Sequence, residues 1–420
     1  MVKKSILLKP SLRHSHITAD ATPQHPLPNP KLLRRCGKLT DSNSLLDDFT
    51  EAARSAGLVG EIRNAKILLL AIISRVIDRP VSVVVKGARS GGKNTLVEAV
   101  LKFFERDAYY ELTAMSEKAI AYFSQPLKNR TLVVTEAAGI KKGGDLFLRS
   151  LLSEGRISYE TVSGGKTRKV ELEGPTGLIL TTTEVKLYED DETRLISIDI
   201  SETTPHTRKV LMAIGHAFAH PEKKRHRRPP DAWLALLKWI AIKPPRVKIP
   251  FAESISSLMS DADTRLYRDI NALLGLVCAH ALLHRGRRKT DKLGHLLATI
   301  DDYKAVRGLL HDIIARGIEA AVSPSVRRVV NAVEQLSNGA TGVSGRDLVV
   351  HLGINKAGIS RHVKAAIGLC YLRNLEEGKG KAARYVIGDA MPSDTSVIPT
   401  SKAVALHHRK RVASLKVKAA

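Results

Sequence analysis

The sequence is poor in cysteine and has no long apolar run. Its 3 cysteines stand far apart and form no CxxC pair, so neither a disulfide framework nor a cysteine zinc cage is indicated. The longest apolar run, Ile67–Ile73, falls far short of the roughly 20 residues that a membrane span requires. The N-terminus shows no signal-peptide pattern. These absences predict a cytoplasmic protein without a membrane span.

Acidic residues are scarce relative to basic ones. The 420 residues include 67 Lys and Arg but 42 Asp and Glu, which gives a net charge of +25 and a pI near 10.0. A surface this basic attracts polyanions, and nucleic acid is the commonest such partner, although ribosome association or nonspecific attraction to the nucleoid also fits the charge. Aromatic residues are only 4% of the chain, so the core depends on Leu, Ile, Val and Ala.

Composition and periodicity divide the chain into five stretches, in line with the two or three domains expected for about this length. In order they are a basic arm without periodicity (1–43), a strand–helix domain with two leading helices (44–215), a helical, lid-like region (216–322), a compact unit (323–389) and a basic tail (390–420). The arm and the tail are predicted to be disordered, because they have few apolar residues and high charge.

Five β-branched or apolar runs alternate with helical patterns in the second stretch. They are Val81–Val85, Ala108–Leu112, Thr131–Thr135, Leu178–Thr182 and Leu195–Ile200. Such alternation predicts an α/β fold with a parallel sheet covered on both faces. Two further β-rich runs, Arg156–Thr161 and Thr167–Leu172, stand on either side of Gly164–Gly165, and this pattern predicts an inserted β-hairpin.

A glycine-rich loop follows the first of these strands and leads into a helix, which is the context of a P-loop NTPase motif. Its amides would cradle phosphate, and Lys93 would reach the β/γ-phosphates. The alternative is a glycine-rich turn that happens to contain Gly-Lys. Asn94 stands where Ser or Thr usually binds magnesium, and its amide oxygen is a hard ligand, so Asn94 is the predicted Mg²⁺ ligand. The predicted ATP-binding residues are Gly87, Ser90, Gly91, Gly92, Lys93, Asn94 and Thr95.

Three further residues are candidates for catalysis. Glu136 ends the third strand and is predicted to polarise the attacking water, whereas Thr135 replaces the first acid of the usual pair. Thr182 ends the fourth strand, where a γ-phosphate sensor is expected, and Arg194 is placed as an arginine finger toward a neighbouring subunit. The structural alternatives are a helix cap for Glu136, β-propensity for Thr182 and a solvated Arg194.

Six motifs occur in an order and spacing typical of one family. They read GARSGGKN, AYYELTAMSEKAIAYF, LVVTEAAG, LLSEGRISYETV, GPTGLILTTT and DETRLISI. Over about residues 60–215 the chain resembles the helicase-type ATPase region of DNA primases and replication proteins of bacterial mobile elements and phages. The inserted hairpin is similar, more distantly, to that of AAA+ helicases of superfamily 3.

The resemblance implies a homo-oligomeric ring whose hairpins contact DNA in the central pore. Lys166, Arg168 and Lys169 would then be the residues that contact DNA, although a solvated basic hairpin fits their charge equally well. Members of this family often have a zinc-binding primase module. This sequence has no cysteine cluster for one, so primer synthesis is not assigned, and a primase would act from another chain.

Residues 325–388 have the pattern of a winged helix-turn-helix, similar to those of bacterial regulators and replication initiators. Three helical runs are followed by two short strands around a basic, glycine-bearing turn. The third helix, Lys356–Cys370, is expected to enter the major groove, while the wing contacts the DNA backbone. The predicted DNA-binding residues are Lys356, Ser360, Arg361, Lys364, Lys379 and Lys381. The alternative is a winged helix that contacts protein.

Together these features predict an ATP-dependent helicase or origin-remodelling ATPase that acts in DNA replication of a mobile element or phage. The substitutions at Asn94 and Thr135 leave a second reading open, namely a nucleotide-gated winged-helix regulator that hydrolyses little or no ATP. A third reading is a structural DNA-binding protein with a vestigial loop, and it predicts no nucleotide binding.

Overall fold

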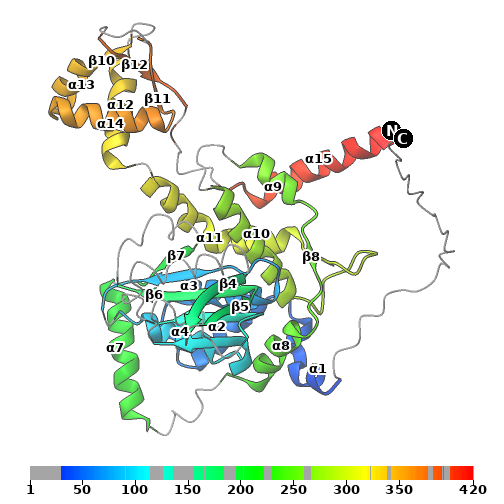
Figure 1. Ribbon diagram of the computed structural model, residues 1–420. Coiled ribbons are helices and arrows are strands. Elements are labelled where there is room, and N and C mark those ends of the chain that lie inside the picture. Colours follow the sequence, from blue (N-terminus) through cyan, green and yellow to red (C-terminus); the bar gives the residue numbers. More distant parts are fainter. Residues whose placement is uncertain are drawn as a thin grey trace, which may run out of the picture.

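A computed structural model gives the fold of the chain. It describes residues 30–419 apart from 90, 114–125, 136–155, 164–165, 184–194, 202, 222–228, 260–265, 322, 338–341, 377–381, 390 and 392–397. Figure 1 shows a central sheet surrounded by helices, with a smaller C-terminal unit set apart from this body. No helix within the described ranges is long and apolar enough to span a membrane.

The central sheet is parallel and five-stranded, with the order β2-β3-β6-β1-β7. The strands are β1 (Val83–Lys86), β2 (Tyr109–Leu112), β3 (Arg130–Val134), β6 (Thr176–Thr182) and β7 (Ile196–Asp199). Every residue of β1 and β6 is buried, as expected when both faces of a parallel sheet are covered. The α/β class and the five parallel strands predicted from the sequence are confirmed.

The order of the strands marks one end of the sheet as a place for a ligand. The chain runs from β1 out to β2, returns through β3 to β6, and then crosses β1 to reach β7. The connections from the adjacent strands β1 and β6 therefore leave in opposite directions. In open α/β sheets, ligands bind outside the carboxyl ends of the strands at such a switch point.

Helices from both ends of the chain share one core with this sheet. The helices concerned are α2 (Leu45–Ser55), α3 (Ile62–Ile73), α4 (Lys93–Leu101), α8 (Asp231–Ala241), α9 (Ala252–Leu258), α10 (Leu266–Leu283) and α11 (Ile300–Ala321). A continuous cluster of buried apolar side chains runs through them, with α3 buried along almost its whole length. The rings of Phe49, Phe103 and Trp233 meet edge to face within it and join α8 to α2. A short parallel pair, β8 (Val247–Lys248) and β9 (Leu296–Leu297), lies beside α10.

One helix of the body has no buried residue among those described. This helix, α7 (Thr204–Ala219), follows β7. Figure 1 shows it at the left edge of the body. Its exposed side chains include Leu211, Met212, Ile214 and Phe218, and the last is 79% exposed.

Both ends of the chain contain structure where composition predicts disorder. In the arm, α1 (Pro30–Cys36) packs on α8 and continues into a 3-10 helix at Gly37–Asp41. In the tail, α15 (Ser401–Ala419) begins against α9 and α11, with Val404 fully buried. Ahead of it, the Tyr303 hydroxyl donates to the Pro399 carbonyl oxygen at 2.6 Å, and Arg307 Nε donates to the same oxygen at 2.9 Å. Composition misled here, because contacts distant in sequence stabilise these segments.

Two antiparallel strands lie outside the five-stranded sheet. They are β4 (Arg156–Ser163) and β5 (Lys166–Glu173), paired in register from Arg156 with Glu173 to Ser163 with Lys166. The two residues between them, 164–165, lie outside the described residues.

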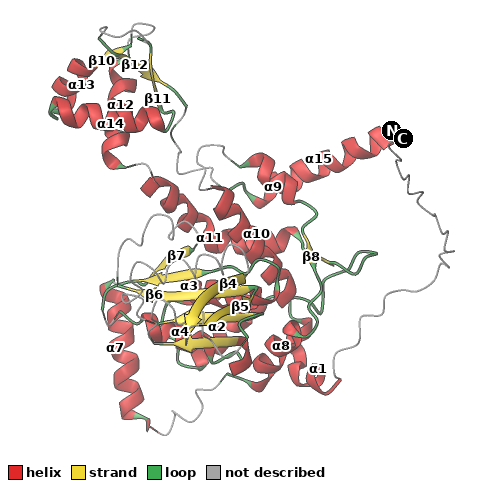
Figure 2. Cartoon of the chain, viewed as in Figure 1, coloured by secondary structure: helices red, strands yellow, loops and turns green. Residues whose placement is uncertain are grey.

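The C-terminal unit has its own small core. Its elements are α12 (Pro324–Leu336), β10 (Val343–Ser344), α13 (Gly345–Leu352), α14 (Lys356–Gly368), β11 (Leu372–Asn374) and β12 (Arg384–Ile387). The three helices pack together beside a sheet with the order β10-β12-β11, as Figure 2 shows. Ser344 and Asp347 form a capping box on α13, and the Asn355 side chain accepts from the Gly358 amide on α14.

Candidate functional site

The loop between β1 and α4 is a compact turn at the carboxyl end of β1. Gly92 caps α4 with a left-handed backbone (φ 88°), which glycine adopts without strain. The Gly91 amide donates to the Ala88 carbonyl oxygen at 3.1 Å, and a Cβ on Gly91 would lie 3.0 Å from that oxygen. A side chain at this position would therefore crowd that carbonyl oxygen, and glycine avoids the contact.

Lys93 is the first residue of α4, and its side chain folds back over this loop. It is 8% exposed, and Nζ donates to the carbonyl oxygens of Gly87 at 2.8 Å and Ala88 at 2.6 Å. These contacts hold a cation at the amino end of a helix and beside the glycines, where an anionic ligand would gain both a charge and the helix dipole. Ser90, in the middle of the loop, lies outside the described residues.

Asn94 is connected to the neighbouring strand β6 instead of pointing to solvent. The Thr181 hydroxyl donates to Asn94 Oδ1 at 3.0 Å, and Thr181 is fully buried. Thr182, the predicted sensor, is buried directly after it and lies opposite Lys86 of β1 in the sheet register. The structure thus brings Asn94 and the end of β6 together, whereas Thr95 is exposed.

Thr135, which replaces the first acid of the usual pair, follows β3 and points back into the sheet. Its hydroxyl donates to the Leu112 carbonyl oxygen at 3.3 Å, and its amide donates to the same oxygen at 2.9 Å. The other two catalytic candidates, Glu136 and Arg194, lie outside the described residues, so their geometry stays a prediction.

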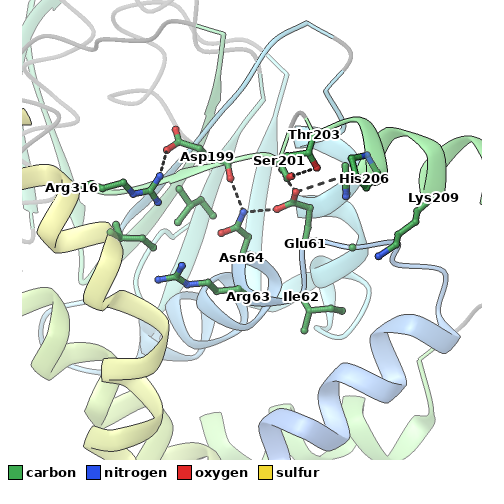
Figure 3. Close-up of a pocket in the computed structure, with 14 residues that line it drawn as sticks. Glu61, Ile62, Arg63, Asn64, Asp199, Ser201, Thr203, His206, Lys209 and Arg316 are labelled. Atoms are coloured by element: carbon green, nitrogen blue, oxygen red, sulfur yellow. Dashed lines mark hydrogen bonds and ion pairs between the residues drawn. The ribbon is translucent and has the colours of Figure 1, made fainter. Parts of the chain in front are cut away.

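A pocket of about 430 Å³ opens beside the loop, one strand away (Figure 3). Its lining comes from the start of α3, the end of β7, the start of α7 and from α11. Glu61 accepts from Asn64 Nδ2 at 2.5 Å and from the Ser201 amide at 2.7 Å, which joins α3 to the end of β7. Asp199, also in the lining, lies opposite Lys86 in the register between β7 and β1. The pocket and the loop are therefore neighbours at the same end of the sheet.

Sequence reasoning missed this pocket. The residues that form it stand far apart in the chain, so no local motif contains them. The one local signal is Gly60–Glu61, two consecutive residues in the left-handed region immediately ahead of α3.

A second concentration of chemical groups lies between α10 and α11. Asp302 is fully buried and accepts from His280 Nδ1 at 2.7 Å, from Arg288 Nε at 3.0 Å and from the amide of Thr299 at 2.7 Å. Burial acts to raise the pKa of the Asp302 carboxyl, but the hydrogen bonds from His280 and Arg288 outweigh it and hold the pKa far below its ordinary value.

A metal ion does not fit this cluster. His280, His284 and Asp302 place potential ligand atoms within 4.8 Å of one another. However, both carboxylate oxygens already accept hydrogen bonds, two of them from the Arg288 guanidinium. A buried cation beside that guanidinium would be strongly disfavoured. The arrangement therefore connects two helices and is not a metal centre.

The predicted DNA-binding residues of the C-terminal unit share one helix and are solvent-exposed. They are Lys356, Ser360, Arg361 and Lys364 of α14. Lys379 and Lys381 lie outside the described residues. On the antiparallel pair, Lys169 is exposed and forms an ion pair with Glu171 at 2.5 Å, whereas the side chains of Lys166 and Arg168 are not among those that the structure describes.

Neither a protein-family model nor a curated protein matches the chain. Its function is therefore inferred from the geometry of two regions, the loop end of the sheet and the surface of α14.

Proposed function

We propose that the chain is an ATP-binding and DNA-binding replication protein with a P-loop at Gly87–Asn94. The observation that carries the proposal is the position of Lys93, a buried cation held against a glycine turn at the carboxyl end of β1. This is the end of the sheet, and the type of turn, at which phosphate groups bind.

The neighbouring pocket is the proposed position of the nucleoside part of ATP. Because Asp199 lies one strand from Lys86, a nucleotide with its phosphates at the loop extends into the pocket. Both polar groups and aliphatic side chains, such as those of Ile198 and Ile313, line it. That combination suits a base and a ribose.

The proposed activity is ATP hydrolysis that drives DNA unwinding or origin remodelling in a ring of identical chains. In this proposal Glu136 polarises the attacking water, Thr182 senses the γ-phosphate, and Arg194 acts on a neighbouring subunit. The exposed apolar side chains of α7 support an oligomer, because a contiguous apolar surface of this kind typically contacts protein.

DNA contacts are proposed at two places. The C-terminal unit acts as a winged helix that inserts α14 into the major groove, with Lys356, Ser360, Arg361 and Lys364 facing DNA. The antiparallel pair β4–β5 acts as a pore hairpin through Lys166, Arg168 and Lys169. The three-helix packing and the exposure of the α14 side chains support the first proposal.

A nucleotide-gated regulator with little or no hydrolysis is the second candidate. It is favoured by the hydrogen bonds of Asn94 with Thr181 and of Thr135 with Leu112, which engage the groups standing where a metal site is usual. The hydrogen-bonded side chains of Asn94, Thr181 and Thr135 thus fit the predicted magnesium at Asn94 poorly. No step is therefore assigned to a metal here.

The experiment that separates the candidates is ATP hydrolysis by the purified protein, with and without single-stranded DNA. Turnover stimulated by DNA supports the motor, and tight ATP binding without turnover supports the regulator. Lys93→Ala should weaken ATP binding by about a hundredfold, because the variant cannot form charged hydrogen bonds to phosphate. Lys102→Ala, an exposed lysine just beyond α4, is the matched control and should bind ATP normally. Equal binding by both variants would contradict the phosphate site.

A further inference from the structure

The phosphate loop is unusually rich in positive charge. From Lys86 to Asn94 it contains Lys86, Arg89 and Lys93 and no acidic residue. Lys86 and Lys93 are 7% and 8% exposed, so two of these cations are set in place at the base of the loop, whereas Arg89 is exposed beside it. Magnesium normally offsets part of the charge of a nucleotide triphosphate, and the buried Lys93 is placed to offset part of it here.

The Asn94 side chain turns its amide oxygen toward β6. Its oxygen accepts from Thr181 at the end of β6, and its Nδ2 group makes no hydrogen bond with any residue that the structure describes. An amide NH₂ donates to phosphate oxygens and repels a metal ion. The Ser or Thr usual at this position offers a metal a hydroxyl oxygen instead.

The described residues at the ends of β3 and β6 include no carboxylate. At the carboxyl ends of β3 and β6 the described residues are Thr135, Thr181 and Thr182, and the hydroxyls of Thr135 and Thr181 donate to protein oxygens. Magnesium in such sites is held by one or two carboxylates together with the phosphates. At these two strand ends the described residues therefore offer hydroxyl groups in place of carboxylates, and Glu136, which follows Thr135, lies outside the described residues.

We propose that this loop binds the metal-free form of the nucleotide, with the Asn94 amide donating to a phosphate oxygen in the position usually taken by magnesium. The inference rests on the proposed ATP site and specifies which ionic form of ATP that site accepts. Thr181 is a positioning residue in this arrangement, because it fixes which end of the amide faces the phosphates.

The test is calorimetric titration of the full-length protein with ATP, in excess magnesium and in EDTA. The wild-type dissociation constant should differ by no more than about twofold between the two media. Binding that is about tenfold or more weaker in EDTA would overturn the inference and leave the proposed function standing. Absence of ATP binding in both media would overturn the proposed function itself.

Two substitutions test the assigned residues. Asn94→Thr restores a hydroxyl at the metal position, and its ATP binding should become about tenfold tighter in magnesium than in EDTA. Thr181→Val frees the amide and should weaken binding about threefold in both media. Glu98→Gln, an exposed position one turn further along α4, is the control and should match the wild type. An Asn94→Thr protein that binds equally in both media, with a wild-type melting temperature, would show that Asn94 does not set the metal dependence.

Discussion

The body and the C-terminal unit use charge in opposite ways. In the body, Lys93 and Asp302 are buried, and each forms hydrogen bonds with specific partners. In the C-terminal unit, Arg361 and Lys364 lie on the outer surface of α14, with their charges in water. Buried charges are costly unless every partner is in place, whereas surface charges act through a field that salt screens. The charges of the body therefore act through fixed short-range contacts, and those of the unit through a long-range field.

The largest expected effect comes from breaking a buried charge in the body. Asp302→Asn removes the carboxylate and leaves Arg288 with no counter-charge in a site where its side chain is 15% exposed. Removal of one partner of a buried pair typically costs about 3–5 kcal/mol of unfolding free energy, which urea denaturation would measure. Asp301→Asn, the exposed neighbour, should leave stability unchanged. Equal unfolding free energies for the two variants would mean that the buried charge of Asp302 does not stabilise the body.

An intermediate effect is expected from pH. Burial, together with the neighbouring His280, lowers the pKa of His284 to about 4, and the nearby Arg288 adds to the shift while Asp302 opposes it. The unfolded chain has the ordinary value near 6.5, so below that pH it binds more protons than the folded chain. Stability is therefore complete above about pH 6.5 and is lost as the pH falls toward about 4, with a loss of about 2 kcal/mol by about pH 5.

Urea denaturation at several pH values measures this effect, and the comparison with His284→Gln isolates it. The variant lacks the titrating group, so its stability should fall less between neutral pH and pH 5 than that of the wild type. Parallel curves for the two proteins would assign the pH dependence to other groups and not to the buried histidine.

The smallest effect on stability is expected in the C-terminal unit. Arg361→Gln and Lys364→Gln should each change unfolding free energy by less than about 0.5 kcal/mol, because both side chains are exposed. Each should also reduce the salt dependence of DNA binding by about one unit of logarithmic slope for each phosphate that the side chain no longer neutralises. Arg328→Gln removes an exposed charge from α12 instead, and an equal change in slope there would mean that the unit attracts DNA without a preferred face.

Local patterns allowed the sequence to predict much of the body. The run of valines before Gly87 identified β1, because a β-branched run that ends at a glycine turn strongly favours a buried strand. In the C-terminal unit, Ser344 and Asn355 marked the starts of α13 and α14 through the same capping bonds that the structure contains.

Features that depend on distant residues were not predictable in this way. Glu61 and Ser201 meet although 140 positions separate them, and neither belongs to a motif. The segment just ahead of α15 is held by hydrogen bonds from Tyr303 and Arg307, and composition alone does not reveal these contacts. The bond between Asn94 and Thr181 joins two predicted motifs, but only the sheet order shows that their side chains meet.

The contacts of Tyr303 and Arg307 with the Ile398–Pro399 segment also have a topological consequence. The chain leaves the body at the end of α11, passes through the C-terminal unit, and comes back to the first turns of the same helix. The C-terminal unit is thus connected to the body at both of its ends and not by a single linker. A protease that cuts once between α11 and α12 would leave it bound through α15, and its release would require a second cut before Ile398.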